Sequence, residues 1–224
     1  HPELMLRQAE ALPERLSALA VGPGLGTQPA AAALLVAALE RTIPLLRDAD
    51  ALNLIGTDPK LKAALKARTT PTLLTPHPAE AARMLGTDTA SVQANRLHAA
   101  LEIARSCRAL VVLKGCGSII ATPDERWFVN GSGHPGMASA GMGDVLTGLI
   151  VGLLAQGWPA ESALIAGVHL HGAAADRLAR EGIGPVGLTA SETIDAARGV
   201  FNGWLIEAQR DPRHPGVAAQ RPGR

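Results

Sequence analysis

The sequence predicts an α/β fold, because short apolar runs alternate with longer Ala-rich stretches along most of its 224 residues. Apolar residues make up 47% of the chain and aromatic residues only 2%, so the core must be built from Ala, Leu, Val and Ile. The length favours one domain, which we place at residues 1–210. Pro, Gly, Gln and Arg dominate from residue 211 onward, so we expect a disordered tail over 211–224.

Most of the predicted strands end in a polar or Gly-rich turn, and the run over 110–114 is the clearest buried strand. We expect strands over 16–21, 43–47, 72–75, 110–114, 118–121 and 126–129, the last two forming a hairpin. We expect helices over 29–41, 79–85, 89–106, 160–180 and 189–209. A further helix begins at Asp144 and is apolar nearly all round, so we expect it to be central and fully buried, with Gly148 and Gly152 allowing close contact with a neighbour.

Composition excludes several classes of function. The formal net charge is +1, charged residues are 18% of the chain, and Tyr is absent, so we expect neither a nucleic-acid partner nor an acidic membrane surface. No apolar run reaches the roughly 20 residues that a membrane span needs. The two cysteines, Cys107 and Cys116, form no paired motif, which favours a reducing cytoplasm over a disulfide framework.

The most informative motif is Gly141-Met142-Gly143-Asp144, which stands directly before an apolar helix. Glycines allow a ligand to approach the backbone closely. The first N–H groups of a helix have no partner and carry a partial positive charge, so they are suited to bind phosphate. Asp144 would stand beside that phosphate; on spacing alone, a simple helix cap is equally consistent. The small, flexible residues of 131–143 favour the binding site, because they are poorly suited to packing.

Other candidate residues also follow predicted strands. Lys114 ends the buried strand and opens the turn Gly115-Cys116-Gly117-Ser118, which suits a nucleotide phosphate, although a tight hairpin with a solvated lysine is the simpler interpretation. The run 22–26 is Gly-rich but matches neither a dinucleotide-binding loop nor a P-loop. Asp48 and Asp50 fit a metal site, an acid pair or a turn. His77 lies between two prolines just past a strand end, where α/β proteins bind ligands. We therefore expect 22–26, His77, 114–118 and Asp144 to converge at one end of the sheet.

Six segments occur in an order that resembles the dehydratase domain of NAD(P)H-hydrate repair proteins. They are 21–27, 48–54, 74–85, 111–120, 133–157 and 186–198, and they cover nearly the whole chain except the tail. The resemblance implies a ribokinase-like fold, with a central, mostly parallel sheet covered by helices on both faces. It also implies ADP-dependent removal of water from NADHX and NADPHX, the hydrated forms of the reduced nicotinamide cofactors.

The resemblance assigns roles to particular positions. Asp144 is implied to be the catalytic base, and Gly26, His77 and Asp144 correspond to substrate-binding positions. Nucleotide-binding positions correspond to Lys114, Gly115, Cys116, Gly117, Ser118 and Gly143. Glu80 corresponds to the place where related vitamin kinases hold Mg²⁺ through water. A homo-oligomer is implied, as is an NAD(P)H-hydrate epimerase domain fused to or associated with this one.

The chain departs from the family pattern at a few positions. Met142 stands where a small residue is common, His134 where Asn is common, and Ala79 where Gly is common. The run Cys116-Gly117-Ser118 replaces a common Ala-Gly-Thr. The chain begins at His1, and we interpret it as a fragment that lacks an N-terminal strand and helix of the domain. Two other functions fit the same motifs: a vitamin-precursor kinase of the same fold, and a non-catalytic module that binds nucleotide. The segments 75–78 and 48–53 favour the dehydratase.

Overall fold

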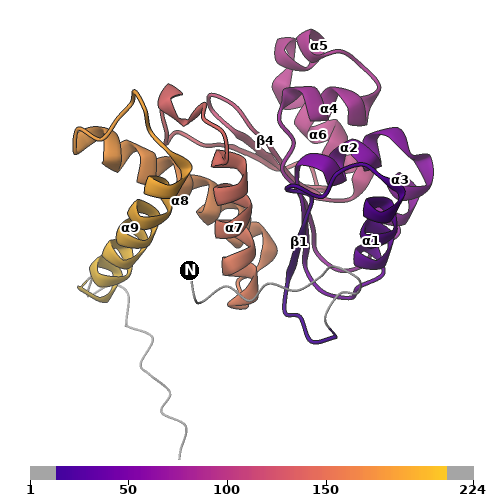
Figure 1. Cartoon of the computed structure of the whole chain (residues 1–224), viewed down its shortest axis with the longest axis horizontal. Helices are drawn as coiled ribbons and strands as arrows, with labels where there is room; N and C mark the ends of the chain where they lie inside the picture. Colours follow the sequence, from indigo (N-terminus) through magenta and orange to yellow (C-terminus); the bar gives the residue numbers. More distant parts are fainter. Residues whose placement is uncertain (1–13, 211–224) are drawn as a thin grey trace, which may run out of the picture. The chain divides into compact units, whose positions relative to one another are not determined.

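A computed structural model describes residues 14–210 of the chain (Figure 1). The predicted tail over 211–224 and the first 13 residues lie outside the described part. The chain forms two compact units. Of the described residues, the first unit contains 14–131 and 143–169, and the second contains 132–142 and 170–210.

The first unit is organised around one six-stranded sheet, whose strands lie in the order of the sequence. The strands are β1 (Leu19–Val21), β2 (Leu45–Arg47), β3 (Thr72–Leu74), β4 (Leu110–Leu113), β5 (Ile119–Ala121) and β6 (Trp127–Val129). β1 to β4 are parallel, whereas β4–β5 and β5–β6 pair antiparallel. All six predicted strands are present, each shorter than expected. Because β2 and β3 are buried along their whole length, their sequences do not alternate between apolar and polar residues as those of half-exposed strands do.

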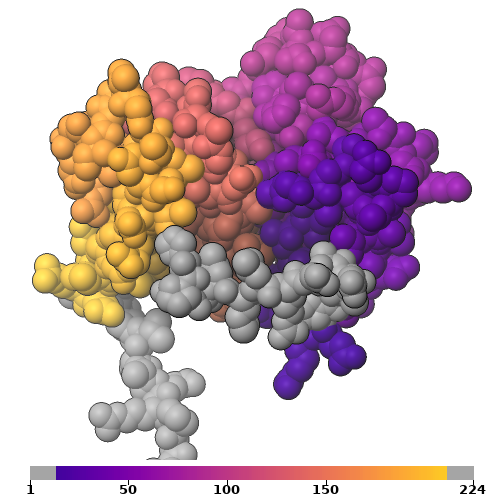
Figure 2. All heavy atoms as spheres, in the orientation of Figure 1, coloured from indigo at the N-terminus to yellow at the C-terminus, as the bar shows by residue number. Residues whose placement is uncertain are grey.

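The helices that connect the parallel strands lie on one face of the sheet (Figure 1). Right-handed crossovers between strands that follow one another in space require this placement. The helices are α1 (Pro29–Leu39), α2 (Ala49–Thr57), α3 (Pro59–Lys66), α4 (Pro78–Leu85), α5 (Thr89–Ala94) and α6 (Arg96–Cys107). They pack as one continuous layer, in which α2 contacts α4 and α4 contacts α6 (Figure 2). The predicted α/β class with a mostly parallel sheet is thereby confirmed.

The sequence-based prediction missed two helices and joined two others, for local reasons. α2 and α3 were not predicted, and a turn had been left open for Asp48. Asp48 and Asp58 stand at the N-cap positions of these helices, and the Asp58 carboxylate accepts the Lys60 N–H at 2.8 Å. The helix expected over 89–106 is two helices. They separate at Asn95, whose backbone leaves the helical region and whose side chain accepts the His98 N–H to start α6.

α7 (Met142–Ala155) and the first half of α8 (Ala160–Arg180) complete the first unit. α7 lies on the face of the sheet opposite α1–α6 (Figure 1). It is buried on one side only, because Asp144 and Gly148 are exposed, so the expectation of a fully buried helix is wrong. Gly148 and Gly152 face open space, and the close approach occurs instead at Gly167, where an added Cβ would lie 2.6 Å from Ile150 Cγ1. None of the helices within 14–210 is both long and apolar enough to cross a bilayer.

The second unit joins the segment 132–142 to the second half of α8 and to α9 (Ala190–Arg210). The segment was expected to be flexible, but it is fixed against α8. The Gly133 N–H donates to Asp176 Oδ2 at 2.8 Å, and His134 Nε2 lies 3.0 Å from the Ala175 carbonyl oxygen. An added Cβ at Gly172 would lie 2.3 Å from Ser132 Oγ. The glycines of this region therefore also serve packing, contrary to the sequence-based interpretation.

Arg47 is a buried charged residue of the sheet whose burial is energetically unfavourable. Arg47 ends β2 and is 0% exposed, and its three guanidinium nitrogens have no hydrogen-bond partner among the described residues. Burial lowers the pKa of Arg47 to about 9, with a further contribution from nearby Arg68. Because the folded-state pKa lies below the ordinary value, the cost of burying the charge is fully present below about pH 9 and decreases as the pH rises above it.

We predict that Arg47→Met stabilises the protein, because Met keeps most of the side-chain volume and removes an unpaired buried charge. Replacement of a buried ionic group by an apolar one of similar size contributes about 1–4 kcal/mol, which corresponds to about 2–4 °C in Tm for each kcal/mol. Arg68→Met is the control. Arg68 donates to the Leu39, Arg41 and Ile43 carbonyl groups, so its loss lowers Tm. A lower Tm for Arg47→Met in thermal unfolding would show that the guanidinium has a partner.

Candidate active site

The carboxyl ends of the four parallel strands meet at one edge of the sheet, and the predicted site residues of the first unit follow them. Gly22 follows β1 with φ +137°, and an added Cβ would lie 1.7 Å from the Asp48 carbonyl oxygen, so only glycine permits this crossing. The loop then turns back, and the Gly26 N–H donates to Asp50 Oδ2 at 2.8 Å. Asp50 is therefore a loop-fixing residue rather than one of an acid pair.

An ion pair between β2 and β4 forms the centre of the site. Lys114 Nζ lies 2.6 Å from Asp48 Oδ1, and the side chains are 20% and 2% exposed, respectively. The second oxygen of Asp48 accepts the Thr147 hydroxyl of α7 at 3.1 Å. Asp48 is thus neither a turn residue in solvent nor a free metal ligand. It connects two strands and a helix that are far apart in the sequence.

The first turn of α7 lies directly beside this ion pair. An added Cβ at Gly143 would lie 3.4 Å from Asp48 Oδ2 and 3.5 Å from Lys114 Nζ. Asp144 is the third residue of α7, since the helix begins at Met142, so the interpretation of Asp144 as an N-cap is wrong. Its side chain is exposed and has no hydrogen-bond or ion-pair partner within 14–210. A carboxylate that is left free at a helix N-terminus, one residue after the glycine that approaches Lys114, is available to a ligand.

His77 and Glu80 form a reciprocal cap at the start of α4. His77 Nδ1 accepts the Ala79 and Glu80 N–H groups at 3.1 and 3.3 Å, and Glu80 Oε2 accepts the His77 N–H at 2.7 Å. Burial lowers the pKa of His77, and Lys114 adds to this effect, so the imidazole is neutral near pH 7. With Nδ1 occupied by backbone donors, the neutral ring carries its proton on Nε2, which lies 3.3 Å from Glu80 Oε1.

Glu80 does not fit as a direct ligand of Mg²⁺. The carboxylate is buried, one oxygen is bonded to the His77 N–H, and the other lies 3.3 Å from His77 Nε2. Lys114 Nζ stands 3.9 Å from Oε2 and would repel a cation there. Burial raises the pKa of Glu80, and Lys114 partly offsets that rise. Among the described residues, no group of three His, Cys, Asp or Glu side chains could hold a metal ion.

The turn over 114–118 is held from behind by Arg96, the first residue of α6. Arg96 Nη1 donates to the Cys116 carbonyl at 2.6 Å, and Nη2 donates to the Leu113 carbonyl at 3.2 Å. Gly115 has φ +152°, and an added Cβ would lie 2.7 Å from Arg96 Nη2, so glycine is needed here. Ser118 Oγ closes the turn by bonding both the N–H and the C=O of Gly115. The alternative of a hairpin with a solvated lysine holds only in part: β4 and β5 do pair antiparallel across this turn, but Lys114 is not solvated, because its side chain is 20% exposed and paired with Asp48.

The predicted site residues of the first unit therefore converge at the carboxyl edge of the sheet. Lys114 lies beside Gly143 and the first turn of α7, and His77 and Glu80 lie at the end of the neighbouring strand β3. Sequence reasoning missed Thr147 and Arg96 and left Asp48 undecided. Thr147 is one polar residue in an apolar helix, which is a usable signal for a buried hydrogen bond. Arg96 gave no signal, because an arginine at the start of a helix is common on protein surfaces.

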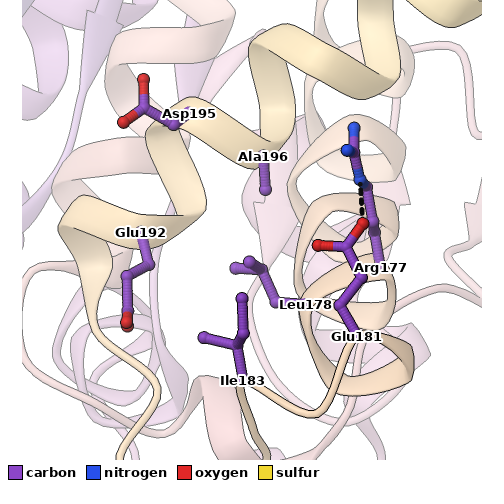
Figure 3. A pocket seen from close by; sticks show the side chains of 7 residues that line it. All are labelled: Arg177, Leu178, Glu181, Ile183, Glu192, Asp195 and Ala196. Carbon is purple, nitrogen blue, oxygen red and sulfur yellow. Dashed lines mark hydrogen bonds and ion pairs between the residues drawn. The ribbon is translucent and has the colours of Figure 1, made fainter.

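A second hollow lies in the second unit, between the end of α8 and the start of α9 (Figure 3). Leu178, Ile183 and Ala196 form its apolar part, and acidic side chains surround them. The Arg177–Glu181 ion pair at 2.8 Å closes one side, and Glu192 is bonded to Thr189. None of the residues predicted for the site lines this hollow.

The sheet order and the site at its carboxyl edge are those of a ribokinase-like α/β protein. A ribokinase-like superfamily protein from Enterococcus faecalis is 26% identical, with a TM-score of 0.68 over 84% of this chain and 63% of its own. The model of the NAD(P)H-hydrate dehydratase family matches residues 1–196, so the chain belongs to this family. The resemblance seen in the sequence is confirmed.

Individual relatives agree with this assignment. The chain is 47% identical over 205 residues to the ADP-dependent (S)-NAD(P)H-hydrate dehydratase of Neisseria meningitidis, covering 90% of this chain and 69% of that protein. It is 40% identical to the bifunctional NAD(P)H-hydrate repair enzyme of Coxiella burnetii, of which it spans 41%. It is also similar to the ADP/ATP-dependent NAD(P)H-hydrate dehydratase of Bacillus subtilis co-crystallised with ATP and Mg²⁺. That match has a TM-score of 0.78 and 34% identity and covers 88% of this chain and 70% of that one.

We predict that Asp48 and Lys114 are strongly coupled in folding. A double-mutant cycle of Asp48→Asn and Lys114→Met, measured by urea unfolding, should give a coupling of about 1–3 kcal/mol, because either single change leaves a desolvated partner. The exposed pair Glu102–Arg105 is the matched control and should give less than about 0.5 kcal/mol. Equal coupling in the two cycles would contradict the central position of the Asp48–Lys114 pair.

Proposed function

We propose that the protein catalyses the ADP-dependent dehydration of the S-forms of NADHX and NADPHX, which restores NADH and NADPH. The observation that carries this proposal is the meeting of Lys114 with the first turn of α7, beside a free Asp144. Such a site offers positive charge for phosphate and a base for a hydroxyl proton, and membership of the dehydratase family supplies the substrate.

The nucleotide would lie along the turn of β4 and the start of α7. In this proposal the backbone of Lys114, Gly115, Cys116, Gly117 and Ser118 lies against ADP. Gly143 brings the backbone N–H groups of α7 to the phosphates, where their partial charge binds anions. Lys114 Nζ stabilises the charge that develops on the phosphoryl group during its transfer. Asp48 keeps the ammonium in place, because the ion pair restricts its position.

The nicotinamide hydrate would occupy the neighbouring strand ends, in contact with Gly26, His77 and Asp144. Asp144 takes the proton of the substrate hydroxyl. The hydroxyl oxygen then forms a bond to the β-phosphorus of ADP, while the bond between that phosphorus and the bridging oxygen of AMP breaks. The phosphate ester then loses inorganic phosphate as the carbon–oxygen bond breaks. Loss of a ring proton restores the carbon–carbon double bond. ADP and the hydrate thus give AMP, phosphate and the reduced cofactor, and no net oxidation occurs.

Mg²⁺ belongs to this proposal as a companion of the nucleotide. The Bacillus relative was crystallised with ATP and Mg²⁺, and Mg²⁺ is usually bound through phosphates and waters with one or two carboxylates. Because Glu80 is already engaged by His77 and Lys114, we propose that the phosphates supply the principal ligands. The ion would neutralise phosphate charge during transfer.

The setting of the enzyme belongs to the same proposal. We propose a homo-oligomer in the cytoplasm, without nucleic-acid or membrane partners, and an epimerase domain fused to or associated with this one, since several relatives are bifunctional repair enzymes. A vitamin-precursor kinase would use the same phosphate site. The family match and the 47% identity to a dehydratase favour the repair reaction, and the free carboxylate of Asp144 speaks against a non-catalytic module.

We predict that Asp144→Asn lowers the rate of dehydration by about 10²–10⁴-fold, the usual contribution of a general base. The rate is the recovery of absorbance at the nicotinamide band from prepared NADHX with ADP. Folding and ADP affinity should be retained, because Lys114 and Gly143 are unchanged, and calorimetry and Tm record them in parallel. Asp195→Asn, a change at an exposed residue of α9, should be neutral. A mutant that keeps more than about a tenth of the rate would remove Asp144 from the role of base. The absence of any recovery by the unmodified chain would contradict the function itself.

A further inference from the structure

Arg96 draws two carbonyl groups of the turn after β4 to one side. Its Nη1 donates to the Cys116 carbonyl at 2.6 Å, and its Nη2 donates to the Leu113 carbonyl at 3.2 Å. Neither acceptor is a carboxylate. Hydrogen bonds from a guanidinium group are charge-assisted and stronger than neutral ones, so the arginine restrains the backbone of the turn itself.

The boundary between α5 and α6 gives Arg96 this position. Asn95 lies outside the helical region, with φ −143° and ψ 67°, and accepts the His98 N–H to begin α6. Arg96 is therefore the first residue of α6. A helical side chain points back toward the N-terminus of its helix, so the guanidinium group projects beyond the start of α6. In an uninterrupted helix the same side chain would lie along the preceding turn instead.

The carbonyl contacts of Arg96 also orient two N–H groups, because a trans peptide carries its C=O and N–H on opposite sides. In the 113–114 peptide, the N–H points away from Arg96 and donates to the Pro76 carbonyl at 2.8 Å. In the 116–117 peptide, the Gly117 N–H points away from Arg96 as well, and no residue of the described part of the chain accepts it. One backbone donor of the turn is therefore available to a ligand.

The orientation of the 116–117 peptide depends on Arg96. Gly115 and Gly117 have φ +152° and +62°, and glycine adopts positive and negative φ with similar ease. The Ser118 hydroxyl bonds only to the backbone of Gly115, so it does not restrain this peptide. Rotation of the central peptide interconverts common turn types. Such a rotation would direct a carbonyl oxygen, rather than an N–H, at the ligand.

We propose that Arg96 is a positioning residue for the nucleotide, which holds the 116–117 peptide with the Gly117 N–H directed at an acceptor oxygen of ADP. The inference rests on the proposed function, in which the nucleotide lies along 114–118. Arg96 reaches the reaction only through this turn. It therefore governs the affinity for ADP, whereas the removal of the hydroxyl proton by Asp144 proceeds without it.

Arg96→Met tests this role by separating nucleotide affinity from catalysis. Release of the peptide should raise the Kd and the KM of ADP about 10–100-fold, the effect of losing a hydrogen bond to a charged group. The kcat at saturating ADP and the KM of NADHX should stay within about threefold of their original values. Arg96→Lys should give an intermediate Kd, because an ammonium group lacks the fork that reaches both carbonyls.

Arg105→Met is the matched control, since Arg105 is an exposed arginine of the same helix. It should bind ADP as the unmodified protein does, and calorimetry measures the Kd in each case. An unchanged Kd for ADP in Arg96→Met would overturn the proposal. Equal losses of affinity for ADP and NADHX would overturn it as well, because they would indicate a general loosening of the fold.

The amide signals of the turn test the orientation in the absence of nucleotide. In ¹⁵N-labelled protein, the Gly117 amide should be rigid, with an order parameter of about 0.85, and Arg96→Met should lower it toward about 0.6. A Gly117 amide that is equally rigid in both proteins contradicts the role of Arg96. A loosened turn in Arg96→Met, together with no binding of ADP by the unmodified chain, would instead contradict the nucleotide site of the proposed function.

Discussion

The ion pair between Asp48 and Lys114 is the interaction on which the rest of the site depends. It joins the ends of β2 and β4, and through Thr147 it fixes α7 against both. Without this ion pair, no contact with Asp48 would hold the Lys114 ammonium group close to the first turn of α7. Asp48 lies 66 positions before Lys114 and 99 positions before Thr147 in the sequence. The buried carboxylate is satisfied by the ammonium and the hydroxyl together, which is the condition under which a buried charge is tolerated. The geometry for phosphate is thus set before any ligand arrives.

The remaining groups of the site are arranged around this pair by local backbone chemistry. Arg96 fixes the turn after β4 from behind, Asp50 fixes the loop at Gly26, and His77 and Glu80 cap each other at the start of α4. Each device satisfies backbone groups that a strand end or helix end leaves unpaired. The side chains of the site are therefore held by rigid backbone segments, as the precise positioning of a phosphoryl group requires.

The fold was largely predictable from the sequence, whereas the connections of the site were not. Short apolar runs indicated the parallel strands, and the turn over 122–125 between two such runs indicated the antiparallel pair of β5 and β6. α2 was missed, since an aspartate at a strand end, such as Asp48 after β2, is typical of a turn and of an N-cap alike; α3 was missed as well. Asn95 divides a helix that its neighbours' propensities would continue. The pairing of Asp48 with Lys114 depends on two strand ends that lie at the same edge with a strand between them, and no local pattern reports that. The assignment of residues 1–210 to one domain remains a prediction.

The fate of the substrate's hydroxyl oxygen tests the account most directly. NADHX prepared by hydration in H₂¹⁸O carries the label in its hydroxyl group. If Asp144 activates that hydroxyl to attack ADP, the oxygen leaves with the phosphoryl group. Turnover in ordinary water should then yield inorganic phosphate with one ¹⁸O atom for each reduced cofactor formed, as measured by mass spectrometry. Unlabelled phosphate, with the label released as water, would mean that dehydration and ADP cleavage are separate events, and the proposed role of the Lys114–Asp144 site would be wrong.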